Sequence, residues 1–273
     1  MKPRTLCFLI IIGIFMLSMI PSVMAGDDDS ESKDPAIALY NRADQYVNVG
    51  DYKSALPLLD QALAMNTSLF VSSGVRQYAL VDKSKVQIEL GDYTGALETI
   101  NQALAFEESD KLWNNKGYVL YRLGRYDEAV ASYNTAIKIT PGYTIALINK
   151  GDALMKLANY QGAIDAYTLA FAFDTQANDL SLFQKAKTWK DMGDAYYTIG
   201  NYPAAIAAYN RVLSFDPENS EASAGIARAQ QQADTSTMMM VVGVIAAVII
   251  CGAFVYYIIQ KRKTLNEKEK SKK

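Results

Sequence analysis

The sequence predicts an all-α fold: a right-handed solenoid of about five helix–turn–helix units, a capping helix and one transmembrane helix. The first observation behind this is a phrase, Gly-x-Tyr-x-x-Ala, that begins at residues 50, 91, 124, 158 and 200, with alanine as its first residue at 158. A period of about 20–50 residues is typical of stacked copies of one unit, none of which buries its apolar face alone. The second observation is an uncharged apolar stretch near the C-terminus, at residues 238–259.

Residues 1–25 have the pattern of a signal peptide. Lys2 and Arg4 precede an apolar run, and small residues stand at the -3 and -1 positions of a cleavage site after Ala25. We expect cleavage there, with an uncleaved signal anchor as the alternative; the domain that follows is exported in both cases. Residues 26–35 read as a flexible acidic leader, and they lack the ligand spacing of a calcium-binding loop.

Residues 186–219 show how one unit is built. One face of a first helix is indicated by the helical spacing of four residues, Trp189, Met192, Gly193 and Tyr196. Gly200 ends that helix, as a C-terminal glycine does. A second apolar face follows at Ala205, Tyr209 and Leu213. The pattern predicts two antiparallel helices joined by a tight turn, with small residues where their axes approach.

These residues resemble the tetratricopeptide repeat, whose pattern is Trp-x2-Leu-Gly-x2-Tyr, then Ala-x3-Phe, then Pro. The unit at 186–219 matches this pattern with Met192 for leucine and Tyr209 for phenylalanine. The third and fourth units carry most of the pattern, and the first two are degenerate. The resemblance covers residues 36–219 and implies the right-handed solenoid. A polar helix at 221–233 suits its terminal cap, which extends the solenoid to 36–233.

The resemblance also implies a binding surface. In this family the first helix of each unit lines the concave side through its positions 2, 5, 9, 12 and 13. In the last three units these positions are Lys111, Asn114, Tyr118, Tyr121, Arg122, Ile145, Ile148, Asp152, Met155, Lys156, Lys187, Lys190, Asp194, Tyr197 and Thr198. Tyrosines mixed with charges of both signs suit a protein or peptide partner. Tyr118 and Tyr121 are the strongest candidates, with ordinary core packing as their alternative.

One known ligand of the family is not expected here. Some members grip a C-terminal carboxylate with two lysines, two asparagines and an arginine. In this sequence Tyr118 and Asp191 stand where an asparagine and the arginine are needed, and an aspartate there would repel a carboxylate.

The steps of the phrase from 50 to 91 and from 158 to 200 are longer than the other two, and both contain the triplet Ser-Leu-Phe, ending at Phe70 and Phe183. One interpretation is that the extra residues lengthen helices and that both phenylalanines pack on the solenoid. The other is that they project as apolar anchors for a partner. Pro57, within the second helix of the first unit, should kink that helix or delay its start.

Residues 238–259 form the predicted transmembrane helix, since about 20 apolar residues span a bilayer. The basic tail at 260–273 holds seven Lys/Arg against two Glu, which places it in the cytoplasm and the solenoid outside the cell membrane. A stripe of small residues in the span could support weak dimerisation, although chance composition is the default and the oligomeric state stays open. The stripe consists of Gly243, Ala247 and Cys251.

Composition excludes other classes of function. Residues 26–237 hold 27 acidic against 18 basic side chains, which argues against nucleic acid as a partner. The chain has no histidine, and no pattern indicates catalytic residues, metal ligands or a cofactor site. We therefore expect a non-enzymatic, membrane-anchored scaffold that binds protein or peptide partners on the extracytoplasmic side. The alternative is an accessory factor in envelope protein assembly or secretion that holds clients transiently. A carboxylate-based enzyme is the remote third.

Overall fold

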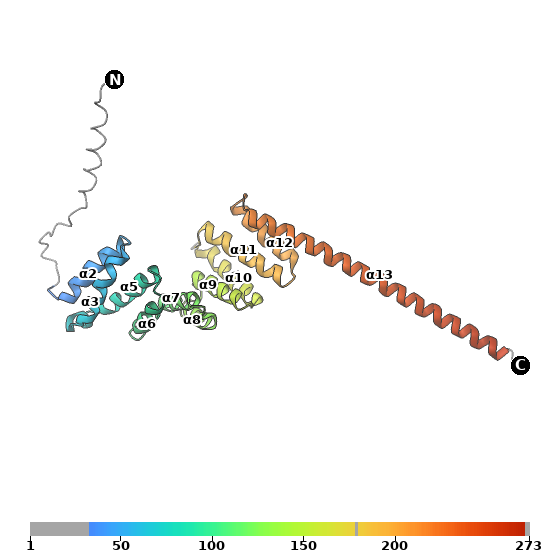
Figure 1. The fold of residues 1–273 in the computed structure, drawn as a ribbon, viewed down its shortest axis with the longest axis horizontal. Coiled ribbons are helices and arrows are strands. Elements are labelled where there is room, and N and C mark those ends of the chain that lie inside the picture. The colour runs from blue at the N-terminus through green and yellow to red at the C-terminus, as the bar shows by residue number, and fades with distance from the viewer. Residues whose placement is uncertain (1–32, 178–179, 271–273) are drawn as a thin grey trace, which may run out of the picture.

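Helix pairs stacked in a row, followed by one long helix, make up the fold (Figure 1). The computed structural model describes residues 33–177 and 180–270. Its helices are α2 (Pro35–Asn48), α3 (Tyr52–Met65), α4 (Ser68–Ser72), α5 (Val75–Glu89), α6 (Tyr93–Leu104), α7 (Asp110–Arg122), α8 (Tyr126–Ile139), α9 (Thr144–Lys156), α10 (Tyr160–Ala177), α11 (Leu182–Thr198), α12 (Tyr202–Phe215) and α13 (Ser220–Lys270). The predicted α-solenoid is confirmed. The predicted signal peptide and most of the acidic leader lie outside the described residues.

The recurring phrase marks the turn inside each unit. Left-handed backbone, with φ between 76° and 80°, occurs at Gly50, Gly91, Gly124 and Gly200. Ala158 takes the same region with φ 56°, which costs a residue that has a Cβ about 1–2 kcal/mol. Except at Arg125, the next residue is an aspartate or asparagine that caps the second helix: Asn201 Oδ1, for example, accepts a hydrogen bond from the Ala204 backbone N–H at 3.3 Å.

A tyrosine lies against a glycine between the two helices of the last three units. The Tyr209 ring packs on Gly193, where an added Cβ would lie 2.6 Å from Tyr209 Cε1. The equivalent pairs are Tyr133 with Gly117 and Tyr167 with Gly151. In the first two units the same positions hold Ala43 with Leu59 and Ser84 with Ile100. Each unit therefore balances a larger residue on one helix against a smaller residue on the other.

The first helices of the units form the inner side of the stack. Contacts join α2 to α5, α7 to α9, α9 to α11, and α11 to α13. Helices approach each other more closely on the concave side of a curved stack than on the convex side. We call the exposed surface of these first helices the inner face, and it carries the predicted binding positions.

The two long steps have different structures. In the first, the short α4 folds Phe70 back into the core of α2 and α3, where its side chain is 0% exposed. The prediction of Phe70 as a projecting anchor is therefore wrong. Phe70 packs on the solenoid as the other interpretation expects, although the extra residues form a separate short helix instead of lengthening one. In the second, α10 and α11 are lengthened to 18 and 17 residues, and Phe183 is 79% exposed.

Pro57 does not delay α3. The helix begins at Tyr52, two residues after its turn glycine, as α6 begins at Tyr93. Proline has no backbone N–H, so the carbonyl of residue 53, in the first turn of α3, lacks its usual helical hydrogen bond from residue 57.

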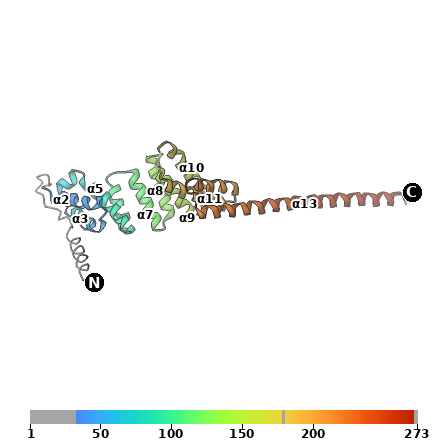
Figure 2. The same cartoon turned by 90° about the horizontal axis from the view of Figure 1, so that it is seen from above.

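The predicted cap and the predicted span are one continuous helix. Helix α13 runs 51 residues from Ser220, and Figures 1 and 2 show it leaving the row of helix pairs as a single rod. Its first turns bury Ala222 and Ala229 against the core of α12. Beyond them α13 is long and apolar enough to cross a membrane, by length and composition, and that apolar segment is not buried by the solenoid.

Candidate functional site: the inner face of the solenoid

Most predicted binding residues lie at least partly exposed on the inner face, but two are buried. Ile148 is 8% exposed and belongs to the core around α9 and α10. Asn114 is 7% exposed, and its Oδ1 accepts a hydrogen bond from Asn149 Nδ2 at 3.0 Å. Asn114 thus joins α7 to α9, and Ile148 packs in the core. Both offer a partner little surface, so their predicted role as contact residues is not supported.

A network of charges joins α9 to α11. Lys187 Nζ donates to Asp152 Oδ2 at 2.9 Å and to Asp191 Oδ2 at 2.7 Å. The Tyr167 hydroxyl donates to Asp152 Oδ1 at 2.7 Å. Burial opposes the charge of Lys187, but the two carboxylates outweigh it and raise the pKa of Lys187. Burial raises the pKa of Asp191, and Lys187 partly offsets that effect.

The same arrangement recurs one unit later. The Tyr209 hydroxyl donates to Asp194 Oδ1 at 2.7 Å, and Lys190 Nζ lies 3.3 Å from Asp194 Oδ2. Lys190 Nζ also lies 3.4 Å from Glu221 Oε2, which ties α11 to α13. The inner-face aspartates of these two units are thus engaged by a tyrosine and a lysine each.

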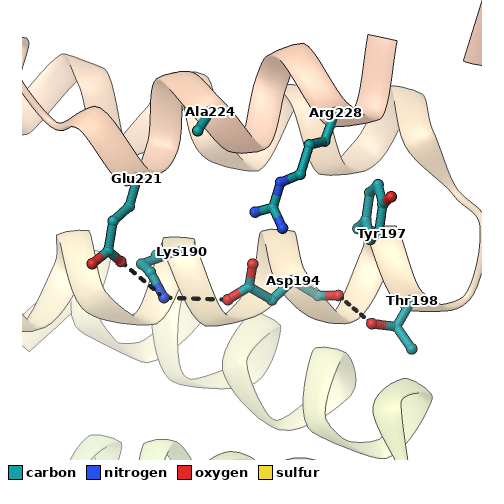
Figure 3. Close-up of a pocket in the computed structure, with 7 residues that line it drawn as sticks. All are labelled: Lys190, Asp194, Tyr197, Thr198, Glu221, Ala224 and Arg228. Atoms are coloured by element: carbon teal, nitrogen blue, oxygen red, sulfur yellow. Dashed lines mark hydrogen bonds and ion pairs between the residues drawn. The ribbon is translucent and has the colours of Figure 1, made fainter. Parts of the chain in front are cut away.

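An open cavity of about 590 Å³ lies between α11 and α13 (Figure 3). Its lining residues are Lys190, Asp194, Tyr197, Thr198, Glu221, Ala224 and Arg228. The Arg228 guanidinium points into this space and stands 5.7 Å from the centre of the Tyr197 ring. Cations and carboxylates alternate around the cavity, which suits a polar ligand segment carrying charges of its own.

Sequence reasoning missed the part of the inner face that α13 contributes. It treated residues 221–233 as a cap, but Glu221, Ala224 and Arg228 face α11 as the first helix of a sixth unit would. These three positions lie one repeat length, about 34 residues, after Lys187, Lys190 and Asp194 respectively. That step was the available signal, and the absence of the repeat motif after residue 219 concealed it.

The centre of the inner face has a different chemistry. Tyr118 occupies the position that holds aspartate in the next two units, and its hydroxyl accepts a hydrogen bond from Arg122 Nη1 at 2.7 Å. Tyr121 packs edge-on against Tyr126, with ring centroids 5.4 Å apart. Burial, followed by the nearby Asp152 charge, raises the pKa of Tyr121. Tyr118 and Tyr121 are both partly exposed, so each packs within the stack and also faces solvent.

Within residues 33–177 and 180–270, no group of three or more His, Cys, Asp or Glu side chains is placed to hold a metal ion. Cys251 is exposed on α13.

Comparison with protein families identifies the repeats. Profiles described as tetratricopeptide repeat match residues 40–111 and 186–219, and one described as TPR repeat matches residues 117–158. No curated protein is significantly similar in sequence.

Solved structures share the fold at low sequence identity. YrrB, described as a TPR protein with an unusual peptide-binding site, is 20% identical with a TM-score of 0.57, covering 70% of this chain and 92% of YrrB. MamA from Desulfovibrio magneticus is 17% identical with a TM-score of 0.58, covering 68% and 98% of the respective chains. A tetratricopeptide repeat protein from Parabacteroides merdae is 20% identical with a TM-score of 0.58, covering 76% of each chain. At these identities the likeness establishes the fold alone.

Proposed function

Because this chain is a tetratricopeptide repeat protein, we propose that it is a scaffold that binds protein or peptide partners through its inner face. The observation that carries this proposal is the composition of that face. Partly exposed tyrosines stand beside charges of both signs, from Tyr118 on α7 to Arg228 on α13. Aromatic side chains and arginine are enriched at protein interfaces. Phe183, exposed beside Leu182 at the start of α11, adds a candidate apolar anchor.

We further propose that α13 anchors the scaffold in the cell membrane by a single pass through residues 238–259. The apolar side chains of this segment are exposed, and Lys261, Arg262 and Lys263 follow it after one residue, Gln260. A basic flank favours the cytoplasm, so the solenoid would be extracytoplasmic. Weak dimerisation through Gly243, Ala247 and Cys251 stays a prediction.

The orientation is tested by labelling intact cells with a membrane-impermeant maleimide. The full chain, with its two cysteines replaced by serine, would carry either Gln230→Cys or Lys263→Cys, both at exposed positions. The proposed topology requires labelling at 230 alone. Labelling at 263 alone would reverse the orientation, and labelling at both sites would contradict a single pass.

We infer that the chain is a binder and not an enzyme. Asp152 and Asp194, the carboxylates that a groove-based enzyme would use, each accept a hydrogen bond from a buried tyrosine and from a lysine. That arrangement holds each carboxylate in a structural network. Turnover by the purified chain that disappears in Asp152→Asn or Asp194→Asn, with the fold intact, would overturn this inference.

The binding role is tested by purifying the full chain from native membranes with whatever it holds. Tyr118→Ala with Tyr121→Ala should remove the co-purifying partner. A matched control is Ile139→Ala with Leu169→Ala, which truncates two exposed side chains on the second helices. Retention of the partner by the tyrosine variant would contradict the site. One stoichiometric partner supports a scaffold, whereas many weakly held clients would favour the accessory role in envelope assembly.

A further inference from the structure

Arg122 presents a positive charge at the centre of the inner face without a carboxylate partner among the described residues. It is the last residue of α7, and its side chain is exposed. Tyr118 accepts one hydrogen bond from its Nη1 atom. The guanidinium carbon lies 4.5 Å from the centre of the Tyr93 ring and 5.7 Å from that of Tyr118. Two aromatic rings therefore fix the position of this cation while leaving its charge uncompensated.

Two other cations of the solenoid are neutralised within the protein. Arg125, three residues further on, donates from Nε and Nη2 to both oxygens of Glu128 at 2.7 and 2.6 Å. Lys187, on the inner face two units later, is held by two carboxylates. Ordinary ion pairing thus accounts for these two cations but not for Arg122.

Two further cations that are unpaired in the described part of the chain lie on the neighbouring first helices. Lys156 ends α9 as Arg122 ends α7, and Lys85 lies on α5; both are exposed and form no ion pair within the described residues. The opposing charge at the corresponding end of α5 is Glu89, which forms no ion pair with Arg122. Since residues 26–237 have nine more acidic than basic side chains, this uncompensated positive charge runs against the bulk of the domain.

We propose that Arg122, with Tyr93 and Tyr118, forms a subsite for the side-chain carboxylate of an aspartate or glutamate in an extended partner segment. The proposal rests on the proposed binding role of the inner face and names the ligand chemistry there. A guanidinium presents several donors in one plane and pairs with a carboxylate through two parallel hydrogen bonds. The partly exposed rings of Tyr118 and Tyr121 supply apolar contact for the residues next to the acid.

The position of Arg122 favours an internal acidic residue over a chain end. The inner face continues on both sides, through α5 before α7 and through α9 after it. A segment lying along it can therefore pass Arg122 and continue in both directions. The set of residues that would clamp a C-terminal carboxylate is incomplete, because Tyr118 and Asp191 replace two of its members.

The test measures fluorescence polarisation of labelled peptides with the full chain in detergent micelles. The probes are Gly-Ser-Phe-Xaa-Phe-Ser-Gly-amide peptides that carry the dye on the N-terminal amine, with Asp or Asn at Xaa, and the Asn peptide with a free C-terminal carboxylate. We expect the Asp peptide to bind at least about tenfold more tightly than the Asn peptide, as a charge-assisted hydrogen bond permits, and to weaken as salt rises. Arg122→Gln should reduce binding of the Asp peptide to that of the Asn peptide, and Arg122→Lys should retain part of the difference.

Arg125→Gln is the matched control, because it removes another exposed arginine that already has a carboxylate partner. It should leave the Asp preference unchanged. Equal binding of the Asp and Asn peptides would overturn the subsite. The proposed binding role of the inner face would still hold if Tyr121→Ala weakened the binding of both peptides. Preference for the free C-terminus, or no binding at millimolar peptide, would also overturn the subsite. The binding role is then judged by the partner purification alone. Far-UV circular dichroism verifies that each variant is folded.

Discussion

Replacing Gly193 with alanine should destabilise the solenoid, although alanine is the better helix former. Helix propensity alone predicts a gain of about 1 kcal/mol in the free energy of unfolding. The structure predicts a loss, because the new Cβ would lie 2.6, 2.8 and 3.0 Å from three atoms of the Tyr209 ring. Carbon atoms prefer separations of about 3.5–4.0 Å, so the ring would have to move by roughly 1 Å.

The Tyr209 ring has little room for that movement. Its side chain is 1% exposed, and its hydroxyl is held by Asp194. On the far side lies Gly225 of α13, where an added Cβ would stand 2.7 Å from Tyr209 Cζ. Overpacking of a confined site costs about 1–3 kcal/mol, which exceeds the gain in propensity. We therefore expect a net loss of up to about 2 kcal/mol, and a fall in Tm of about 2–4 °C for each kcal/mol.

The assay is thermal and urea unfolding of the full chain in detergent, followed by circular dichroism. A second variant carries Gly193→Ala with Tyr209→Leu, which reproduces the pair formed by Ala43 and Leu59 in the first unit. In the Tyr209→Leu background, Gly193→Ala should cost nothing or stabilise the protein, giving a coupling energy of about 1 kcal/mol or more between the two positions. A rise in stability for Gly193→Ala alone would refute the close-packing argument.

Two further predictions concern stability. Ala158→Gly should raise the free energy of unfolding by about 0.5–1 kcal/mol, since glycine adopts φ 56° without strain. Chemical denaturation measures this change, and Gly124→Ala is the control, which should lower the free energy of unfolding. A lower free energy of unfolding for Ala158→Gly would contradict the prediction. Alkaline pH should unfold the solenoid, because the pKa values of Tyr167 and Tyr209 are raised above the ordinary value of 10.0. Burial is the largest cause for both, followed by the Asp152 charge for Tyr167 and by the hydrogen bond to Asp194 for Tyr209. Because these pKa values are raised in the folded state, the contribution of the neutral tyrosines to the free energy of unfolding is complete below about pH 10 and is lost as the pH rises further. Tyrosinate absorbance at 295 nm should therefore increase together with the loss of circular dichroism, whereas full ionisation near pH 10 with the fold intact would count against this reasoning.

Much of the architecture is predictable because turn chemistry is local. Only glycine adopts left-handed backbone without strain, so Gly50, Gly91, Gly124 and Gly200 mark the turns before any contact is known. The spacing of apolar residues then gives two helices for each unit. The burial of Phe70 was not predictable in this way, since the phenylalanine that ends the Ser-Leu-Phe triplet is buried in one long step and exposed in the other.

The candidate binding surface was predictable only in outline. Repeat positions placed Tyr118, Tyr121 and the charged residues on the first helices, where they are at least partly exposed, but they could not show that Asn114 and Ile148 are buried. Whether a cation is neutralised depends on carboxylates that a neighbouring unit supplies. The sequence already shows Asp191 four residues after Lys187 and no acid at that spacing from Arg122, but only the folded stack brings Asp152 to Lys187.

By itself, then, the sequence determined the repeat, its turns, the helical units and an apolar segment long enough for a membrane span, because each depends on composition or on spacing along the chain. The tertiary structure decided which inner-face charges remain uncompensated, and it extended that face onto Glu221 and Arg228. It also joined the cap to the apolar segment in one uninterrupted helix. These features arise where neighbouring units meet, so they depend on how the helices pack against each other as well as on the pattern within any one unit.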